Sequence, residues 1–191
     1  MLRLVSMNKR DELTEAATDY ALAHGLIGLS LRPLAAELGT SDRMLIYHFG
    51  SKDELVAAVL EASNDRSKAV IHAMQPSASL RAAVLDLWAT YTEGQVQRCQ
   101  RMYVEAAALG LFGREPYATS IRASNAVWMA AMATHLERSG VAAADAPRLA
   151  GLIDATFNGV LLDRPLDDEA ESRQIVEDLA TALGRSQRGS E

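Results

Sequence analysis

The stretch that decides the fold is SLRPLAAELGTSDRMLIYHFGSKDEL, which runs from Ser30 to Leu55. It predicts two short helices, over 31–38 and 42–48, separated by a tight turn at Gly39. A third helix begins at Ser51, the first residue of the capping-box pattern Ser-x-x-Glu. Two short helices joined in this way are typical of a helix–turn–helix, which lays its second helix in the major groove of DNA.

The rest of the chain also predicts helices, because apolar residues recur at helical spacing throughout. Ala and Leu dominate and aromatic residues make up only 5%, a composition that favours helix over sheet. The helices expected outside the first two span 9–24, 51–73, 80–93, 95–111, 116–139, 146–162 and 167–183. The sequence therefore predicts an all-α fold of about nine helices.

The only obvious joint between domains is the break around Pro76. It follows a long helix, 52–73, that would link two parts of the chain. We therefore expect an N-terminal three-helix domain over residues 1–52 and a C-terminal helical domain over residues 53–191.

Net charge gives no support for nucleic-acid binding, because the chain carries a formal charge of −6. Residues 1–70 hold eight Lys and Arg against ten Asp and Glu, and residues 71–191 hold eleven against fifteen. Neither part is basic, so strong non-specific affinity for phosphates is not expected. Any contact with DNA must depend on a few locally placed side chains.

Several functional classes are excluded by what the sequence lacks. The single Cys99 forms no disulfide within the chain and fits a reducing compartment, and the longest apolar run, 126–133, is far short of the ~18 residues of a membrane span. There is no HExxH motif, no glycine-rich phosphate loop and no Cys/His pair at metal-binding spacing. We expect a cytoplasmic protein that is not an enzyme and has no metal, no cofactor and no membrane partner.

One group of residues in LAAELGTSDRMLIYHFGSKDEL has the spacing of a known family. The group consists of Gly39, Leu45, His48, Phe49, Ser51 and Lys52. Over about residues 9–60 the chain resembles the TetR family of bacterial transcriptional regulators. One position departs from the family pattern, since Ile46 stands where the family has tyrosine. Tyr47 follows one residue later, about 100° further round a helix. The phosphate contact that the family makes with its tyrosine would therefore fall to Tyr47, to His48 or to no residue.

The resemblance implies an all-helical homodimer that binds a palindromic operator in double-stranded DNA. Two N-terminal domains would present their recognition helices about one helical turn of DNA apart, ~34 Å. The C-terminal domain would bind a small hydrophobic effector and dimerise through its last two helices. Effector binding would release the DNA, which makes a repressor the expected function.

Candidate DNA contacts lie in and around the second helix of the motif. Arg43 is the best candidate to read a base edge, with guanine as its target, and Lys52 is a candidate phosphate contact. Each could instead be an ordinary surface residue, and His48 could be a packed histidine. The full set is Arg32, Thr40, Ser41, Arg43, Met44, Tyr47, His48 and Lys52.

Candidate effector-pocket residues are the aromatic residues and methionines of the C-terminal part, since methionine adapts to varied shapes. Each could equally be core. Glu105 would recognise a cation or a hydrogen-bond donor if it faced a pocket, and otherwise it is a surface or interface acid. The full set is Trp88, Tyr91, Met102, Tyr103, Glu105, Phe112, Trp128, Met129 and Met132.

The dimer interface is expected on the wide apolar stripe of helix 146–162 and on the last helix, although ordinary packing within one chain is the alternative. The candidates are Leu149, Leu152, Ile153, Phe157, Val160, Ile175 and Leu179. The rival function is a helical module that binds a small molecule or a protein and keeps the motif only as a vestigial scaffold. This alternative is supported by the excess of acidic over basic residues and by Ile46, which stands where the family has tyrosine.

Overall fold

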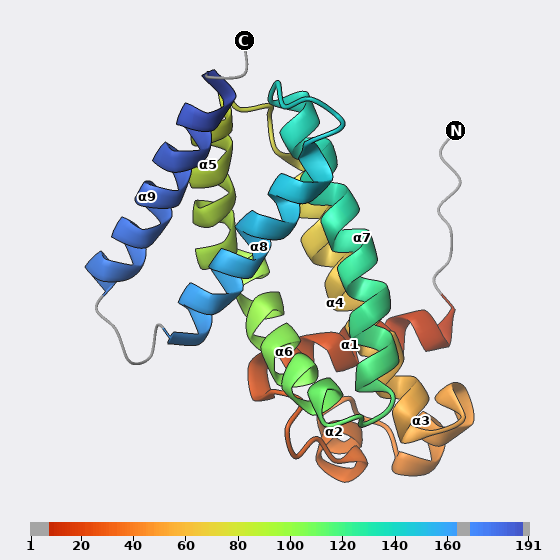
Figure 1. Cartoon of the computed structure of the whole chain (residues 1–191). Helices are drawn as coiled ribbons and strands as arrows, with labels where there is room; N and C mark the ends of the chain where they lie inside the picture. Colours follow the sequence, from red (N-terminus) through yellow and green to blue (C-terminus); the bar gives the residue numbers. More distant parts are fainter. Residues whose placement is uncertain (1–7, 164–168, 189–191) are drawn as a thin grey trace, which may run out of the picture. The chain divides into compact units, whose positions relative to one another are not determined.

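The computed structural model describes residues 8–163 and 169–188, and all regular structure in those ranges is helical (Figure 1). The helices are α1 Lys9–His24, α2 Leu31–Glu37, α3 Asp42–Phe49, α4 Lys52–Ala73, α5 Leu80–Thr92, α6 Gly94–Leu111, α7 Tyr117–Arg138, α8 Ala146–Asp163 and α9 Glu169–Arg188. The predicted all-α fold is confirmed.

The described residues form two compact units. Unit 1 comprises residues up to 66 together with 98–124, and unit 2 comprises 67–97 together with the residues from 125 onward. The division falls within α4, α6 and α7. The functional boundary expected at residue 52 stays a prediction, because a division by packing does not test it.

The core of unit 1 is built around α1, α2, α3 and the first half of α4. Leu34, Leu45 and Leu55 are fully buried there, one from each of α2, α3 and α4. Helix α6 joins the same core through Met102 and Ala106. Side chains four residues apart on α6 share one face, so this helix presents a single apolar edge to unit 1.

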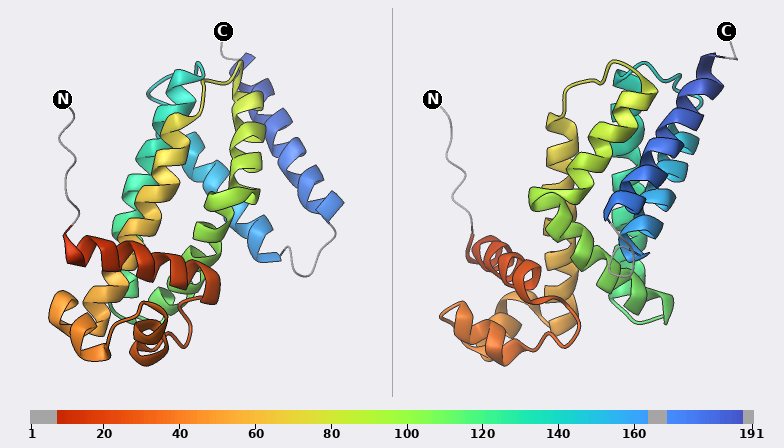
Figure 2. Two further views of the ribbon diagram at one scale, coloured as in Figure 1. Left: turned by 180° about the vertical axis from the view of Figure 1, so that it is seen from behind. Right: turned by 90° about the vertical axis from the view of Figure 1, so that its left-hand side faces the viewer.

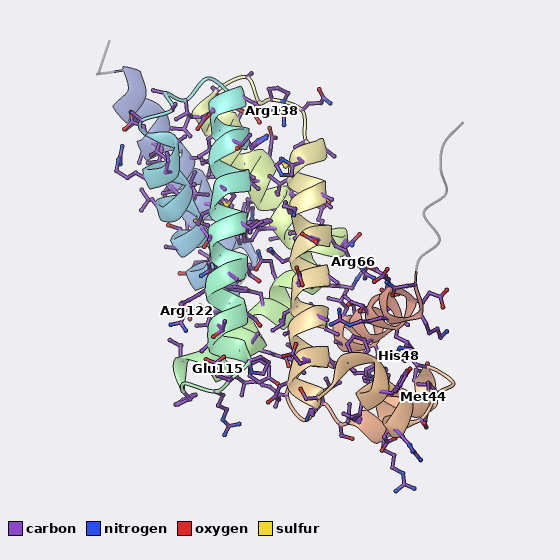
Figure 3. The ribbon with its side chains drawn as sticks, turned by 90° about the vertical axis from the view of Figure 1, so that its right-hand side faces the viewer. Met44, His48, Arg66, Glu115, Arg122 and Arg138 are labelled. Carbon is purple, nitrogen blue, oxygen red and sulfur yellow. The ribbon has the colours of Figure 1, made fainter. Side chains whose placement is uncertain are left out.

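Polar contacts fix α1 within unit 1. Its first turn has a complete capping box, in which Asn8 and Asp11 exchange hydrogen bonds between side chain and backbone. Arg66 of α4 binds the carboxylates of Glu15 and Asp19 on α1, with 2.6 Å between Arg66 Nη1 and Asp19 Oδ1 (Figure 3). These contacts hold α1 against α4.

In unit 2, α5 and α9 lie side by side, as the views in Figures 1 and 2 agree. The predicted end of the last helix at Gly184 is wrong, because α9 continues to Arg188. Gly184 instead lies against α5, where an added Cβ would come within 3.3 Å of Arg81 Cβ. Its lack of a side chain serves close helix packing rather than helix termination. The predicted start of this helix, Asp167, lies outside the described residues.

No helix in the described part of the chain is both long enough and apolar enough to cross a bilayer.

Candidate nucleic-acid interface and effector site

The turn between α2 and α3 is fixed by backbone geometry. Gly39 has φ +63°, the left-handed conformation that glycine adopts without a steric penalty. The N–H of Thr40 donates to the carbonyl of Ala35 at 2.9 Å, and Ser41 caps α3 by accepting from the N–H of Met44 at 3.3 Å. The turn predicted from the sequence is therefore formed, and it sets the direction in which α3 leaves α2.

Helix α3 has one buried face. Leu45 and Phe49, one turn apart, are 0% and 5% exposed and anchor the helix in the core of unit 1. The guanidinium of Arg10, from α1, lies 5.4 Å from the centre of the Phe49 ring, a cation–π contact that covers the ring. Because this face is anchored, the remaining surface of α3 is presented to solvent in a fixed orientation.

The exposed surface of α3 carries the predicted recognition residues. Arg43 is exposed and lies one turn from Tyr47, which is 76% exposed, so the two share a face. Met44 is exposed, His48 is half-buried with its ring edge-on to Tyr47, and both lie on α3 (Figure 3). A guanidinium, an apolar side chain and a phenol on one rigid helix are groups suited to the major groove.

The other predicted DNA contacts flank α3. Arg32 on α2 and Ser41 before α3 are exposed, whereas Thr40 is half-buried. Lys52, at the start of α4, is exposed, and its ammonium donates to the backbone carbonyl of Leu29. That bond uses one of three ammonium protons and positions the others beside the motif.

Glu105 of α6 is hydrogen-bonded to backbone amides of unit 1. Its Oε2 accepts from the backbone N–H groups of Leu26 and Ile27, at 2.7 Å and 2.8 Å. It thereby ties α6 to the loop that connects α1 with α2. Of the two roles that the sequence left open, a pocket carboxylate and a surface or interface acid, these contacts to two backbone amides fit the second.

A different carboxylate lies in the apolar interior of unit 2. Asp154 of α8 accepts from the indole N–H of Trp128 at 2.9 Å, from the phenol of Tyr91, and from the side-chain amide of Asn158 at 3.0 Å. The Tyr91 ring packs edge-on against Trp128 and against Phe157, with ring centres 5.4 Å and 5.0 Å apart. Two of the three donors to Asp154 therefore belong to one cluster of packed aromatic rings.

Burial raises the pKa of the Asp154 carboxyl above its ordinary value of 3.8, and the three hydrogen bonds offset only part of that shift. The folded protein therefore holds the proton more tightly than the unfolded chain does. Asp154 consequently lowers stability as the pH rises from 3.8 through its folded pKa, and the loss is complete above that value.

Asp154→Asn should remove this loss. Relative to the wild type, the free energy of unfolding of the variant should increase between pH 4 and pH 7, since asparagine keeps an acceptor for Trp128 and Tyr91 but carries no charge. Urea unfolding at several pH values checks the result. Asp163→Asn, at an exposed acid of the same helix, is the control. A difference between Asp154→Asn and wild type that stays constant with pH would contradict the assignment.

The other predicted pocket residues are dispersed. Trp88 lies beside Phe157 in unit 2, where Met132 is fully buried and Met129 packs half-buried against the core. Met102 is a core residue of unit 1, and Tyr103 is half-buried on α6. Phe112 is 84% exposed, so both readings of it, core and pocket wall, are wrong. It lies in the turn that follows the end of α6 at Leu111.

The predicted dimer interface needs a larger correction. Leu149, Ile153, Phe157 and Val160 are between 0% and 7% exposed and form part of the unit 2 core. They are already covered within one subunit and are unavailable to a partner, so the prediction is wrong for these four. Leu152 and Ile175 are exposed and Leu179 is half-buried.

Sequence reasoning missed Asn158 as part of the Asp154 cluster. A signal existed, because two polar residues four apart interrupt the apolar stripe of α8 and would share a face. No comparable signal marked Glu105, whose partners are backbone amides almost eighty positions away in the chain.

Comparison with known proteins agrees with this geometry. Residues 13–59 match the family described as "Bacterial regulatory proteins, tetR family". The HTH-type transcriptional repressor Rv3405c of Mycobacterium tuberculosis is 31% identical over 72 residues, which are 38% of each chain. The chain thus spans well under half the length of that curated relative.

Solved structures resemble the chain over most of its length. A transcriptional regulator from Rhodococcus sp. Rha1 has a TM-score of 0.74 at 20% identity and covers 94% of this chain and 97% of its own. The multidrug binding protein EbrR, complexed with imidazole, has a TM-score of 0.65 at 25% identity and covers 91% and 96%. An N-terminal helix–turn–helix followed by a helical domain is therefore the fold of this chain.

Proposed function

Since residues 13–59 are a helix–turn–helix domain of the tetR family, we propose that this chain is a DNA-binding transcriptional regulator that acts in the cytoplasm as a repressor. Two copies form a homodimer that binds a palindromic operator. A small-molecule effector bound by unit 2 releases the DNA. The observation that carries the proposal is α3, which is anchored by Leu45 and Phe49 and exposes Arg43 and Tyr47 on one face.

The weak point of the interface is its charge. Asp42 lies beside Arg43, and Asp53 and Glu54 follow Lys52, so the surface gains little from bulk attraction to phosphates. Affinity therefore depends on a few well-placed contacts rather than on many. This makes the two cations, Arg43 and Lys52, the informative positions for mutation.

Arg43→Ala should relax base preference at one position of each half-site and cost ~1–3 kcal/mol of binding free energy on the preferred duplex. The expected reason is loss of a bidentate contact to guanine. Fluorescence anisotropy on the preferred duplex and its single-base variants measures both effects. Arg122→Ala, at an exposed arginine of α7 (Figure 3), is the matched control. An equal loss of affinity on every duplex would contradict a base contact.

Lys52→Gln should weaken binding to all duplexes alike. It should also reduce the slope of the logarithm of affinity against the logarithm of salt concentration by about one, because one fewer counterion is released. Glutamine keeps an N–H donor but removes the charge, so the comparison isolates the phosphate contact from the bond to Leu29. Titrations at several salt concentrations measure the slope. An unchanged slope would show that Lys52 serves the fold alone.

We propose α6 as the element that couples the effector to DNA binding. Residues 94–97 of α6 belong to unit 2, and the remainder belongs to unit 1. Within unit 1, Met102 and Ala106 are buried in the core and Glu105 holds the loop before α2. A shift of α6 would therefore act directly on the loop that positions the helix–turn–helix.

Dimerisation would use the outer faces of α8 and α9. Leu152 and Leu162 are exposed on α8, and Ile175 is exposed and Leu179 half-buried on α9. Exposed apolar residues that gather on neighbouring helices favour association between subunits.

The test of the proposed function is repeated selection of bound sequences from a random pool of duplex DNA by the purified full chain. Enrichment of an inverted repeat with half-sites about one helical turn apart supports it. A pool that stays random after selection contradicts it and favours the vestigial-motif alternative.

A further inference from the structure

The Asp154 cluster lacks a protein counter-charge. The hydrogen-bond donors found at this carboxylate are the phenol of Tyr91, the indole of Trp128 and the amide of Asn158, and all three are neutral. None of the lysine and arginine side chains that the structure describes forms an ion pair with it. Buried charges are usually paired, because removing a charge from water is costly. The carboxylate therefore provides an uncompensated negative charge inside an apolar unit.

A second acceptor beside it is also unsatisfied. Asn158 Oδ1 is buried and has no hydrogen-bond partner among the described residues. Its orientation is fixed, because the Nδ2 group of the same amide donates to both the backbone carbonyl and the carboxylate of Asp154, each at 3.0 Å. Turning the amide over would place an oxygen against those two acceptors. A buried acceptor without a donor is uncommon and costly.

Aromatic residues pack beside the Asp154 carboxylate. Trp88, Phe157, Tyr91 and Trp128 form a continuous chain of edge-to-face contacts with ring centres 5.0–5.4 Å apart. Trp88, Asp154 and Asn158 are each half-buried, so part of each residue meets solvent, although the Oδ1 atom of Asn158 is itself buried. Aromatic faces attract cations, most strongly where water is excluded.

We infer that the effector is an organic cation with an apolar or aromatic body and at least one N–H donor, bound beside Asp154 and Asn158 against the aromatic chain. The ammonium supplies the missing counter-charge to Asp154 and a donor to Asn158 Oδ1. The role of this cation as an effector rests on the proposed function, but its binding to the chain does not require DNA.

The experiment uses the full chain without DNA and four probes of similar size: 2-phenylethylammonium, its trimethylammonium analogue, 2-phenylethanol and 3-phenylpropanoate. Calorimetry gives the affinities. Tryptophan emission gives a local signal, because the only two tryptophans, Trp88 and Trp128, both lie in the cluster. The ammonium should bind about tenfold or more tightly than each of the other three probes.

Two variants assign the contacts. Asp154→Asn should reduce ammonium affinity about tenfold or more and abolish the preference over the neutral alcohol. Asn158→Leu should reduce the difference in affinity between the ammonium and its trimethylammonium analogue. Asp163→Asn, which alters an exposed acid on the same helix, should change neither the ammonium affinity nor the difference between the probes.

The inference is overturned if no probe binds, if the alcohol or the carboxylate binds as well as the ammonium, or if the preference survives in Asp154→Asn. A folded variant is verified by its circular dichroism. Failure of DNA selection would remove the regulatory role but leave these binding results unaffected, so the two proposals fail separately.

Discussion

Gly25→Ala should lower the free energy of unfolding by about 3–5 kcal/mol, because backbone strain and the loss of hydrogen bonds to Glu105 add. Gly25 has φ 84° and ψ 173°, a region essentially restricted to glycine. In addition, a Cβ at this position would lie 2.8 Å from Oε1 and 3.0 Å from Oε2 of Glu105. The carboxylate would have to move away from the N–H groups of Leu26 and Ile27.

Gly28→Ala is the matched control. Gly28 has φ +82°, but an added Cβ would have no heavy atom within 4 Å, so this variant carries backbone strain alone, about 1–2 kcal/mol. Glu105→Gln removes the charge but little volume, so its free energy of unfolding should lie between those of the wild type and Gly25→Ala. Urea unfolding followed by circular dichroism gives all three values. Equal losses at the two glycines would contradict the account of Glu105 as a tie between α6 and the N-terminal helices.

Replacing both Leu152 and Ile175 with Asp should convert the proposed dimer to a monomer and lower affinity for the operator by about 10³-fold or more, because two half-sites could no longer be bound together. These side chains are 43% and 42% exposed in the single subunit, so charges there leave its core intact. Analytical ultracentrifugation should give twice 20.6 kDa for the wild type and 20.6 kDa for the variant.

Leu111→Asp is the control for this experiment, since Leu111 is 87% exposed and lies at the end of α6, away from α8 and α9 in the sequence. It should remain a dimer with unchanged affinity for DNA. A double variant that still sediments as a dimer would show that the subunits meet elsewhere.

The helix–turn–helix could be predicted closely because its determinants are local. Gly39 at the turn, Ser41 and Ser51 as caps, and Leu45 with Phe49 on one face each act within a few residues in the chain. The structure forms each of these features where the sequence placed it.

The two faces of α8 could not be assigned in the same way. Helical periodicity shows that Leu149, Ile153 and Phe157 share a stripe, but it does not show whether that stripe meets the same subunit or a partner. Only the packing of α5, α7 and α9 decides this, and it turns the strongest stripe inward. The weaker one, with Leu152, is left at the surface.

Contacts between distant residues were also beyond prediction. Glu105 reads as an acid in an apolar run, and nothing near it in the chain points to the amides that follow Gly25. The sequence suggests that Asp154, an acid on an apolar helix, makes polar contacts with other helices, but it does not identify its phenol and indole donors, which come from α5 and α7. Both roles are consequences of the tertiary fold.

The central claim is sequence-specific DNA binding, and the most direct measurement compares two dissociation constants. The full chain is titrated with the duplex recovered by selection and with a scrambled duplex of the same composition, at low and at physiological salt. We predict that the selected duplex binds about 10³-fold or more tightly and that both affinities fall as salt increases. Equal affinity for the two duplexes, or no binding to either, would contradict the account.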